Sequence, residues 1–285
     1  MINDQEYITT KLKKTLEKMI ILSMPRLNNL IAMIIGIITS QSVVLSKISQ
    51  ELKNCYYLGT EESKIKRLQR FLGNKAINPE RFYEFFAYKL LQKYKFKSKS
   101  IYIIFDHTTI DDRFVILQFS LKVGKSAVPL LGKLFKYKQD GNKDFIHLKE
   151  GLKFLHNILT PYEFEVTILA ERGFKSSDLF KFIDETLKWK YCIRCTKDMG
   201  ISIVGKRKIK KLEDITPRKG FTKYFYNIKL TAQEYVCNMV VCTAEDSEDV
   251  WFIANNISEL YAIREYKKDL IFKKCLWILK VVNLT

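Results

Sequence analysis

The chain has 285 residues, of which 47% are apolar and 13% aromatic, so it can bury a substantial core and is not a disordered tail. Lysine and arginine number 49 against 31 aspartates and glutamates, which gives a net charge of +18. A surplus of this size favours a polyanionic partner, either nucleic acid or an anionic membrane. Codon bias is an alternative source of part of the charge, because Lys, Ile, Asn, Phe and Tyr are all drawn from A/T-rich codons.

The start of the chain is polar and contains no signal peptide, which predicts a cytoplasmic protein. The most apolar run, residues 30–38, is shorter than the roughly 20 residues that span a bilayer, so we expect no membrane partner. The six cysteines are scattered, which predicts reduced thiols. Cys192 and Cys195 are spaced as CxxC but lie on a predicted strand, where side chains three apart point to opposite faces, so we expect no zinc site there.

Residues 1–97 are predicted to form a helical region. Thr60 has the side chain of an N-cap and is followed by two glutamates, which suit a helix N-terminus. Gly73 ends that helix, and Pro79 opens the next one. The first hundred residues contain 18 Lys and Arg against 8 Asp and Glu, so this region is strongly basic.

Three of these basic residues, Lys66, Arg67 and Arg70, cluster on the short helix that follows Thr60. A basic helix of this kind is often an ordinary solvated face. We interpret this one as a DNA contact because its charge is concentrated on a single short helix.

Residues 98–285 have a different character. Strands are predicted over 100–105, 113–123, 126–138, 165–170 and 189–195, and helices over 145–159 and about 176–187. Three strands, a helix, a strand, a helix and a strand predict an α/β domain with a mixed sheet. Strands over 222–230 and 234–243 indicate a β-rich insertion at about 197–249, a short strand follows over 250–254, and the remainder is predicted to be helical.

Two carboxylates, Asp106 and Glu171, directly follow apolar strands of this domain. An isolated acid in such a position is often a cap or turn residue. Two of them at the carboxyl ends of strands of one sheet, in a basic protein, indicate a shared site. Paired carboxylates can hold divalent metals that activate water and stabilise a leaving oxygen in phosphoryl transfer.

Short motifs occur along the chain in a fixed order. They are Thr60-Glu-Glu-Ser63, Arg67-Leu-Gln-Arg-Phe-Leu72, Ile103-Ile-Phe-Asp-His-Thr108, Arg113-Phe-Val-Ile-Leu117, Ala127-Val-Pro-Leu130, Ile168-Leu-Ala-Glu-Arg-Gly-Phe174, Tyr191-Cys-Ile-Arg194 and Trp251-Phe-Ile-Ala-Asn255. Through these motifs the chain resembles the IS-four family of DDE transposases over about residues 25–268. These segments occur in the family's order. The resemblance implies a ribonuclease-H-like fold, two Mg²⁺ (or Mn²⁺) ions, cleavage at transposon ends and strand transfer by a 3′-hydroxyl.

The same resemblance implies roles for the residues. Asp106 and Glu171 would be metal ligands and catalytic residues. Lys66, Arg67 and Arg70 would contact the double-stranded terminal repeats, while Arg172 and Arg194 would lie near the scissile phosphates. The family also implies a homodimer in the synaptic complex and a nucleoid-associated location.

Two departures from the family pattern predict an impaired copy. The second acid is Glu171 where the family has Asp, and the added methylene can misplace a metal that demands near-ideal geometry. The third acid is expected on a late helix, in a spaced pattern of Tyr, Arg, Glu and Lys. Starting from Tyr261, Lys268 stands at the Glu position, and starting from Tyr266, Lys273 stands there.

The tail predicts a reason for this loss. Residues 268–283, back-translated and read in the next frame, give a string that resembles the family's late helix, although degenerate codons allow many strings. We therefore expect a frameshift, with the true C-terminus elsewhere. A non-enzymatic DNA-binding remnant and a structure-selective nuclease on the same core are the alternatives, and a membrane-surface protein is a weaker one.

Overall fold

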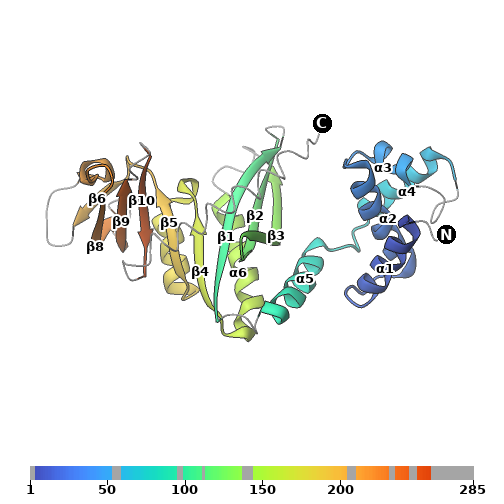
Figure 1. The fold of residues 1–285 in the computed structure, drawn as a ribbon, viewed down its shortest axis with the longest axis horizontal. Helices are drawn as coiled ribbons and strands as arrows, with labels where there is room; N and C mark the ends of the chain where they lie inside the picture. The colour runs from blue at the N-terminus through green and yellow to red at the C-terminus, as the bar shows by residue number, and fades with distance from the viewer. Residues whose placement is uncertain are drawn as a thin grey trace. The chain divides into compact units, whose positions relative to one another are not determined.

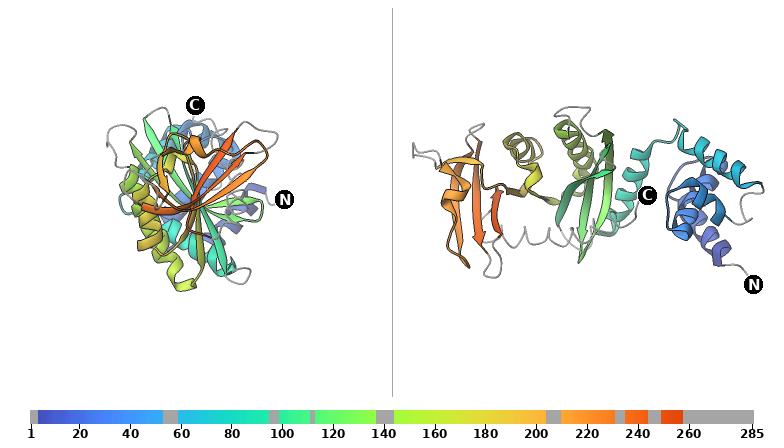
Figure 2. Two further views of the ribbon diagram at one scale, coloured as in Figure 1. Left: turned by 90° about the vertical axis from the view of Figure 1, so that its left-hand side faces the viewer. Right: turned by 90° about the horizontal axis from the view of Figure 1, so that it is seen from above.

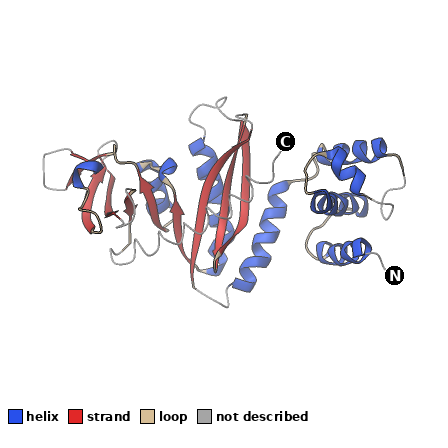
Figure 3. Cartoon of the chain, turned by 45° about the horizontal axis from the view of Figure 1, so that its top comes forward, coloured by secondary structure: helices blue, strands red, loops and turns tan. Residues whose placement is uncertain are grey.

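The computed structural model describes residues 4–52, 59–94, 99–110, 113–136, 144–203, 210–230, 235–243 and 249–257. These residues fall into two compact units that divide between Leu90 and Leu91. The described part of the first unit is helical, and the second contains the sheet (Figure 3). The late helix and the frameshifted tail expected after residue 257 lie outside the described residues.

The helical unit contains α1 (Asp4–Glu17), α2 (Met24–Ser40), α3 (Leu45–Glu51), α4 (Glu61–Leu72) and most of α5 (Pro79–Tyr94). Leu68 of α4 packs with Ala32, Ile48 and Leu52 in one buried cluster. In the described residues no single helix has the length and apolar character of a membrane span; α2 and α3 have them only as a pair, bent by 94°.

The ends of α4 follow from its sequence. Thr60 is the N-cap, because its side-chain oxygen accepts a hydrogen bond from the backbone N–H of Ser63 at 3.3 Å. At the other end Gly73 donates its backbone N–H to the carbonyl of Gln69. The helix that sequence patterning predicts between Thr60 and Gly73 is therefore present.

The second unit contains one ten-stranded sheet, with the order β3-β2-β1-β4-β5-β10-β9-β8-β6-β7 (Figure 1). The strands are β1 (Ser100–Ile110), β2 (Phe114–Val123), β3 (Ser126–Lys136), β4 (Glu165–Ala170), β5 (Lys190–Cys195), β6 (Gly200–Ile203), β7 (Lys210–Lys211), β8 (Thr222–Leu230), β9 (Tyr235–Thr243) and β10 (Val250–Asn255). In the order β3-β2-β1-β4-β5, β4 and β5 run parallel to β1, and β2 is antiparallel to both of its neighbours. This is the ribonuclease-H-like arrangement, so the predicted fold class is confirmed.

The predicted β-rich insertion extends the same sheet rather than forming a separate body. The chain leaves β5, builds β6 to β9, and returns as β10, which pairs antiparallel with both β5 and β9. Strands β6 and β7 are short, with four and two residues, and periodicity did not predict them. The insertion therefore shares a continuous sheet with the core.

Helices α6 (Asp144–Leu159) and α7 (Ser177–Lys181) lie on the same side of the sheet (Figure 2). Right-handed crossovers that run in one direction along a sheet put their helices on one face. Gly151 of α6 allows close packing, since a Cβ there would lie 2.4 Å from ring atoms of Phe119 on β2. After α7 the helix continues as a π-helical segment, Phe182–Thr186.

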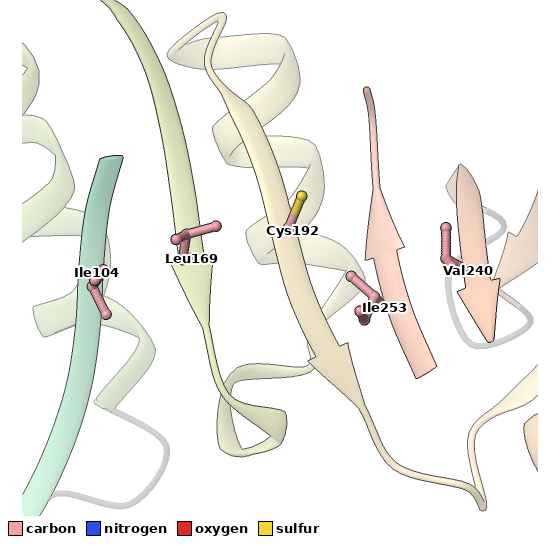
Figure 4. Close-up of a cluster of buried hydrophobic side chains, with 5 residues drawn as sticks. All are labelled: Ile104, Leu169, Cys192, Val240 and Ile253. Atoms are coloured by element: carbon pink, nitrogen blue, oxygen red, sulfur yellow. The ribbon is translucent and has the colours of Figure 1, made fainter. Parts of the chain in front are cut away.

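Side chains alternate between the two faces of the sheet along each strand, and this alternation produces a row of buried residues across five strands. Its members are Ile104, Leu169, Cys192, Ile253 and Val240, which lie side by side across β1, β4, β5, β10 and β9 (Figure 4). Each of these residues is at most 1% exposed. The row fixes the register of the core strands against those of the insertion, because a slip of one residue would invert every side chain.

Candidate functional site

Asp106 and Glu171 follow the last registered pair of two parallel strands. β1 and β4 pair from Ser100 opposite Glu165 to Phe105 opposite Ala170, and the two acids are the next residues of each chain. Neighbouring strands are about 4.8 Å apart, so the two backbones leave the pairing side by side. The register therefore brings these two predicted site residues to one end of the sheet.

The sequence predicts that strand β1 ends at Asp106, but in the structure it continues. β1 continues to Ile110, paired only with β2, and Asp106 lies opposite Gln118. Its Oδ1 accepts the backbone N–H of His107 at 2.8 Å. Asp106 thus lies where β1 separates from β4, and the following residues form a two-stranded extension with β2. The residues that follow Asp106, His107-Thr-Thr109, are polar, so the sequence pattern does not predict a strand there.

Glu171 begins a 3₁₀ turn, Arg172–Phe174, and its backbone is extended, with φ −81° and ψ 170°. Its carboxylate lies beside the guanidinium of Arg194, with Oε2 3.8 Å from Nη1. The Glu171 side chain is 16% exposed, so this pair is screened far less than one on the surface. The turn thus directs Glu171 toward β5.

Arg194 lies on β5 and is 4% exposed. Its Nη2 donates to Oδ1 of Asp249 at 2.5 Å and to the carbonyl of Val250 at 3.4 Å, while the ring centroid of Trp251 lies 5.9 Å from the guanidinium carbon. Its buried Nε has no hydrogen-bond partner. A buried arginine needs such acids, because an unpaired buried charge costs several kcal/mol.

A cavity of about 560 Å³ opens beside Arg194. Its lining contains three cations, Arg172, Arg194 and Lys197, and three acids, Asp198, Glu213 and Asp249. Both arginines that the sequence analysis placed near scissile phosphates therefore line one cavity. Patterning did not identify Asp249, which is the last acid of the acidic stretch Glu245-Asp-Ser-Glu-Asp249 before an apolar strand.

Asp106 and Glu171 suit a magnesium ion that keeps most of its other ligands, and Glu171 contacts Arg194, which lines the cavity. Mg²⁺ is usually bound through one or two carboxylates plus water and substrate phosphates, and Asp106 and Glu171 supply two. Glu171 contacts Arg194 through Oε2, 3.8 Å from Nη1. Across the residues that the structure describes, no group of three His, Cys, Asp or Glu side chains is arranged to hold a metal.

The predicted DNA-binding residues of α4 lie on its exposed side. Lys66 forms an ion pair with Glu62 at 2.8 Å, and Nε of Arg67 donates to Oδ1 of Asn29 at 3.1 Å. Arg70 is exposed in the last turn. Arg70 lies four residues after Lys66 and three after Arg67, so it shares the exposed surface with each of them while Leu68 faces the core.

Cys192 and Cys195 are both free and buried, on opposite faces of β5. Burial raises the pKa of the Cys195 thiol from 9.0 to about 12. A thiol with such a pKa is poorly ionised at neutral pH, and the thiolate is the form that binds metals.

No protein-family model and no curated protein matches the chain. Among solved structures it is similar to an Argonaute of Marinitoga piezophila, whose structure is a complex with a 5′ OH guide RNA and target DNA. The identity is 17% and the TM-score 0.30, over 75% of this chain and 34% of that chain. The chain thus spans about a third of the Argonaute's length. The fold assignment rests on the strand order of the sheet itself.

Proposed function

We propose that the chain is an insertion-sequence DNA transposase of the IS-four type, in a copy that binds transposon ends but cleaves them poorly or not at all. Its substrate is the double-stranded terminal repeat. The observation that carries the proposal is the parallel register of β1 and β4, which sets Asp106 and Glu171 side by side on a ribonuclease-H-like sheet. The sequence motifs around these two residues are the reason for proposing this family.

In this proposal the cavity beside Arg194 receives the phosphodiester backbone. Arg172 and Lys197 at its lining are suited to phosphate oxygens, and Arg194 contributes a buried positive charge. Charge in such a partly closed site acts through a lower effective dielectric than at the surface. These side chains hold and orient the scissile strand against the two carboxylates.

Asp106 and Glu171 would hold Mg²⁺, which supplies a Lewis acid for the phosphoryl oxygens and lowers the pKa of a water nucleophile. Arg194 orients Glu171 through their contact at 3.8 Å. Among the described residues no third His, Cys, Asp or Glu side chain joins them in a group that could hold a metal. The departures in the sequence, Glu171 for Asp and lysines at the third position, support weak or absent cleavage.

DNA recognition would come from α4. Lys66, Arg67 and Arg70 can neutralise phosphates of the duplex, so binding should weaken steeply with salt as counterions are released. In the synaptic complex two copies would hold two ends. A structure-selective nuclease would use the same core without preferring any terminal sequence, and a DNA-binding remnant would prefer it without cleaving.

The test is a binding and cleavage assay on duplexes from the DNA that flanks the coding gene, with shuffled duplexes as the control. We expect preferential binding to one flanking sequence and little or no cleavage in Mg²⁺ or Mn²⁺. Asp106→Asn should bind equally well and remove any residual cleavage. Equal binding to flanking and shuffled DNA would reject end recognition, and sequence-independent cleavage that requires Asp106 would favour the nuclease.

A further inference from the structure

Strand β8 presents exposed aromatic side chains on the insertion. Tyr224 is 38% exposed and Tyr226 49% exposed, and Phe221 just before the strand is 64% exposed. Soluble proteins normally bury such rings or use them for binding. Three of them within six residues indicate a surface with a partner.

The sheet register defines the face on which Tyr224 lies. Tyr224 pairs with Val240, and Val240 pairs with Ile253, so Tyr224 extends the buried row at the point where it reaches solvent. Tyr226 lies within a bulge of the β8–β9 register, between Phe225 and Ile228, where the strand bends. The two exposed phenol rings are therefore two residues apart in the chain, with the second at the bend.

All charged side chains of the chain segment that carries the rings are positive. Residues 216–230 contain Arg218, Lys219, Lys223 and Lys229 and no aspartate or glutamate. Arg218, Lys219 and Lys223 are exposed. For a protein partner we would expect acidic as well as basic side chains on this segment. A polyanion with flat rings matches both the positive charge and the exposed aromatic side chains. Grooves that combine lysine or arginine with aromatic side chains are the usual surfaces for single-stranded nucleic acid.

We propose that Tyr224 and Tyr226 form a stacking platform for unpaired bases of single-stranded DNA, with the neighbouring basic residues binding its phosphates. Base–aromatic stacking needs an accessible base face, so the platform suits an extended strand with unstacked bases. A duplex is excluded because its base faces are covered by neighbouring pairs. This inference goes beyond the proposed function, in which α4 and the cavity beside Arg194 bind the DNA.

The test measures fluorescence anisotropy of a labelled oligothymidylate with the full chain and two double variants. Tyr224→Ala with Tyr226→Ala should weaken binding about tenfold or more, since each stacked base contributes on that scale. Tyr224→Phe with Tyr226→Phe should bind as the parent chain does, because the ring faces remain. Tyr88→Ala, which removes a ring that is 48% exposed on α5, is the matched control and should have no effect.

A second measurement needs no mutation. An oligonucleotide containing 5-iodouracil, irradiated with the parent chain, should crosslink to Tyr224 or Tyr226. Unchanged oligothymidylate affinity in the alanine variant, or crosslinks elsewhere only, would overturn the platform. So would concentration-dependent self-association that the alanine variant abolishes while DNA binding persists, because the patch would then join two copies.

Failure of this inference and failure of the proposed function are distinguishable. Loss of preference for flanking duplex DNA with intact oligothymidylate binding at β8 would reject the transposase proposal alone. Preferential duplex binding with no contribution from Tyr224 and Tyr226 would reject the platform alone.

Discussion

The guanidinium of Arg194 lies between two carboxylates, with Nη1 3.8 Å from Glu171 and Nη2 2.5 Å from Asp249. The two acids come from distant parts of the chain, since Glu171 precedes the insertion and Asp249 is at its end. Their shared arginine therefore joins the core and the returning chain at the proposed site.

Replacing Arg194 by Met should destabilise the sheet unit by about 2 kcal/mol, because the Glu171 carboxylate, which is only 16% exposed, loses its cation. Denaturant unfolding measures this. Lys190→Met on the same strand is the control: its pair with Glu165 has side chains 53% and 61% exposed, so it should change stability by less than about 1 kcal/mol. Equal effects of the two substitutions would contradict the importance given to the buried pair.

Replacing Arg67 and Arg70 together by Ala should weaken duplex binding and reduce its dependence on salt. Each phosphate contact contributes about 0.9 to the slope of log affinity against log salt, so the slope should become shallower by about 2. Binding titrations at several salt concentrations measure it. Lys181→Ala on α7 removes a cation that already pairs with Glu185, and it should leave the slope unchanged.

Gly151→Ala should destabilise the protein by about 1–3 kcal/mol, because its Cβ would lie 2.4 Å from the Phe119 ring and the ring has no free space. Phe119→Leu in the same chain should recover part of this loss by vacating the ring position. A double-mutant cycle measures the coupling. Additive effects would show that α6 does not pack on β2 as described.

The protein should lose stability above about pH 9. Burial raises the pKa of Cys195 from 9.0 to about 12, so the thiol is protonated in the fold when the unfolded chain has already ionised. Its stabilisation is complete below pH 9.0 and is lost as the pH rises toward about 12, with a total on the order of 4 kcal/mol. Burial also raises the pKa of the Cys237 thiol.

Unfolding free energies measured from pH 7 upward should therefore fall more steeply for the parent chain than for Cys195→Ala. The alanine variant is expected to be less stable at pH 7, because it leaves a small cavity, but that cost does not depend on pH. If unfolding free energy fell equally with pH for the two proteins, the raised pKa of Cys195 would be rejected as the cause.

Strong local signals made much of this fold predictable. β4 and β8 have the predicted bounds, since each is a short run of strand-forming residues between clear breaks. Thr60 and Gly73 delimit α4 through their own capping bonds. Asp106 and Glu171 were expected at one end of the sheet because each follows an apolar strand. The parallel register of β1 and β4 agrees with that expectation.

The features that escaped prediction depend on contacts between distant segments. β1 continues past Asp106 because β2 offers it a partner, which no local pattern announces. Arg194 binds Asp249 across 55 residues, and only the return of the chain as β10 brings them together. The addition of the insertion to the core sheet likewise depends on the pairing of β10 with β5.

The long sheet has two outer edges in the described part of the chain, β3 and β7. Pro129 lacks an N–H and lies at the irregularity in the β2–β3 register, while β7 has only two residues, both lysines. Proline, bulges, lysine and short length all hinder the addition of another chain's strand. The molecule can therefore extend its sheet internally without offering a template for polymerisation, and Pro129→Val should promote fibrils or insoluble aggregates on storage.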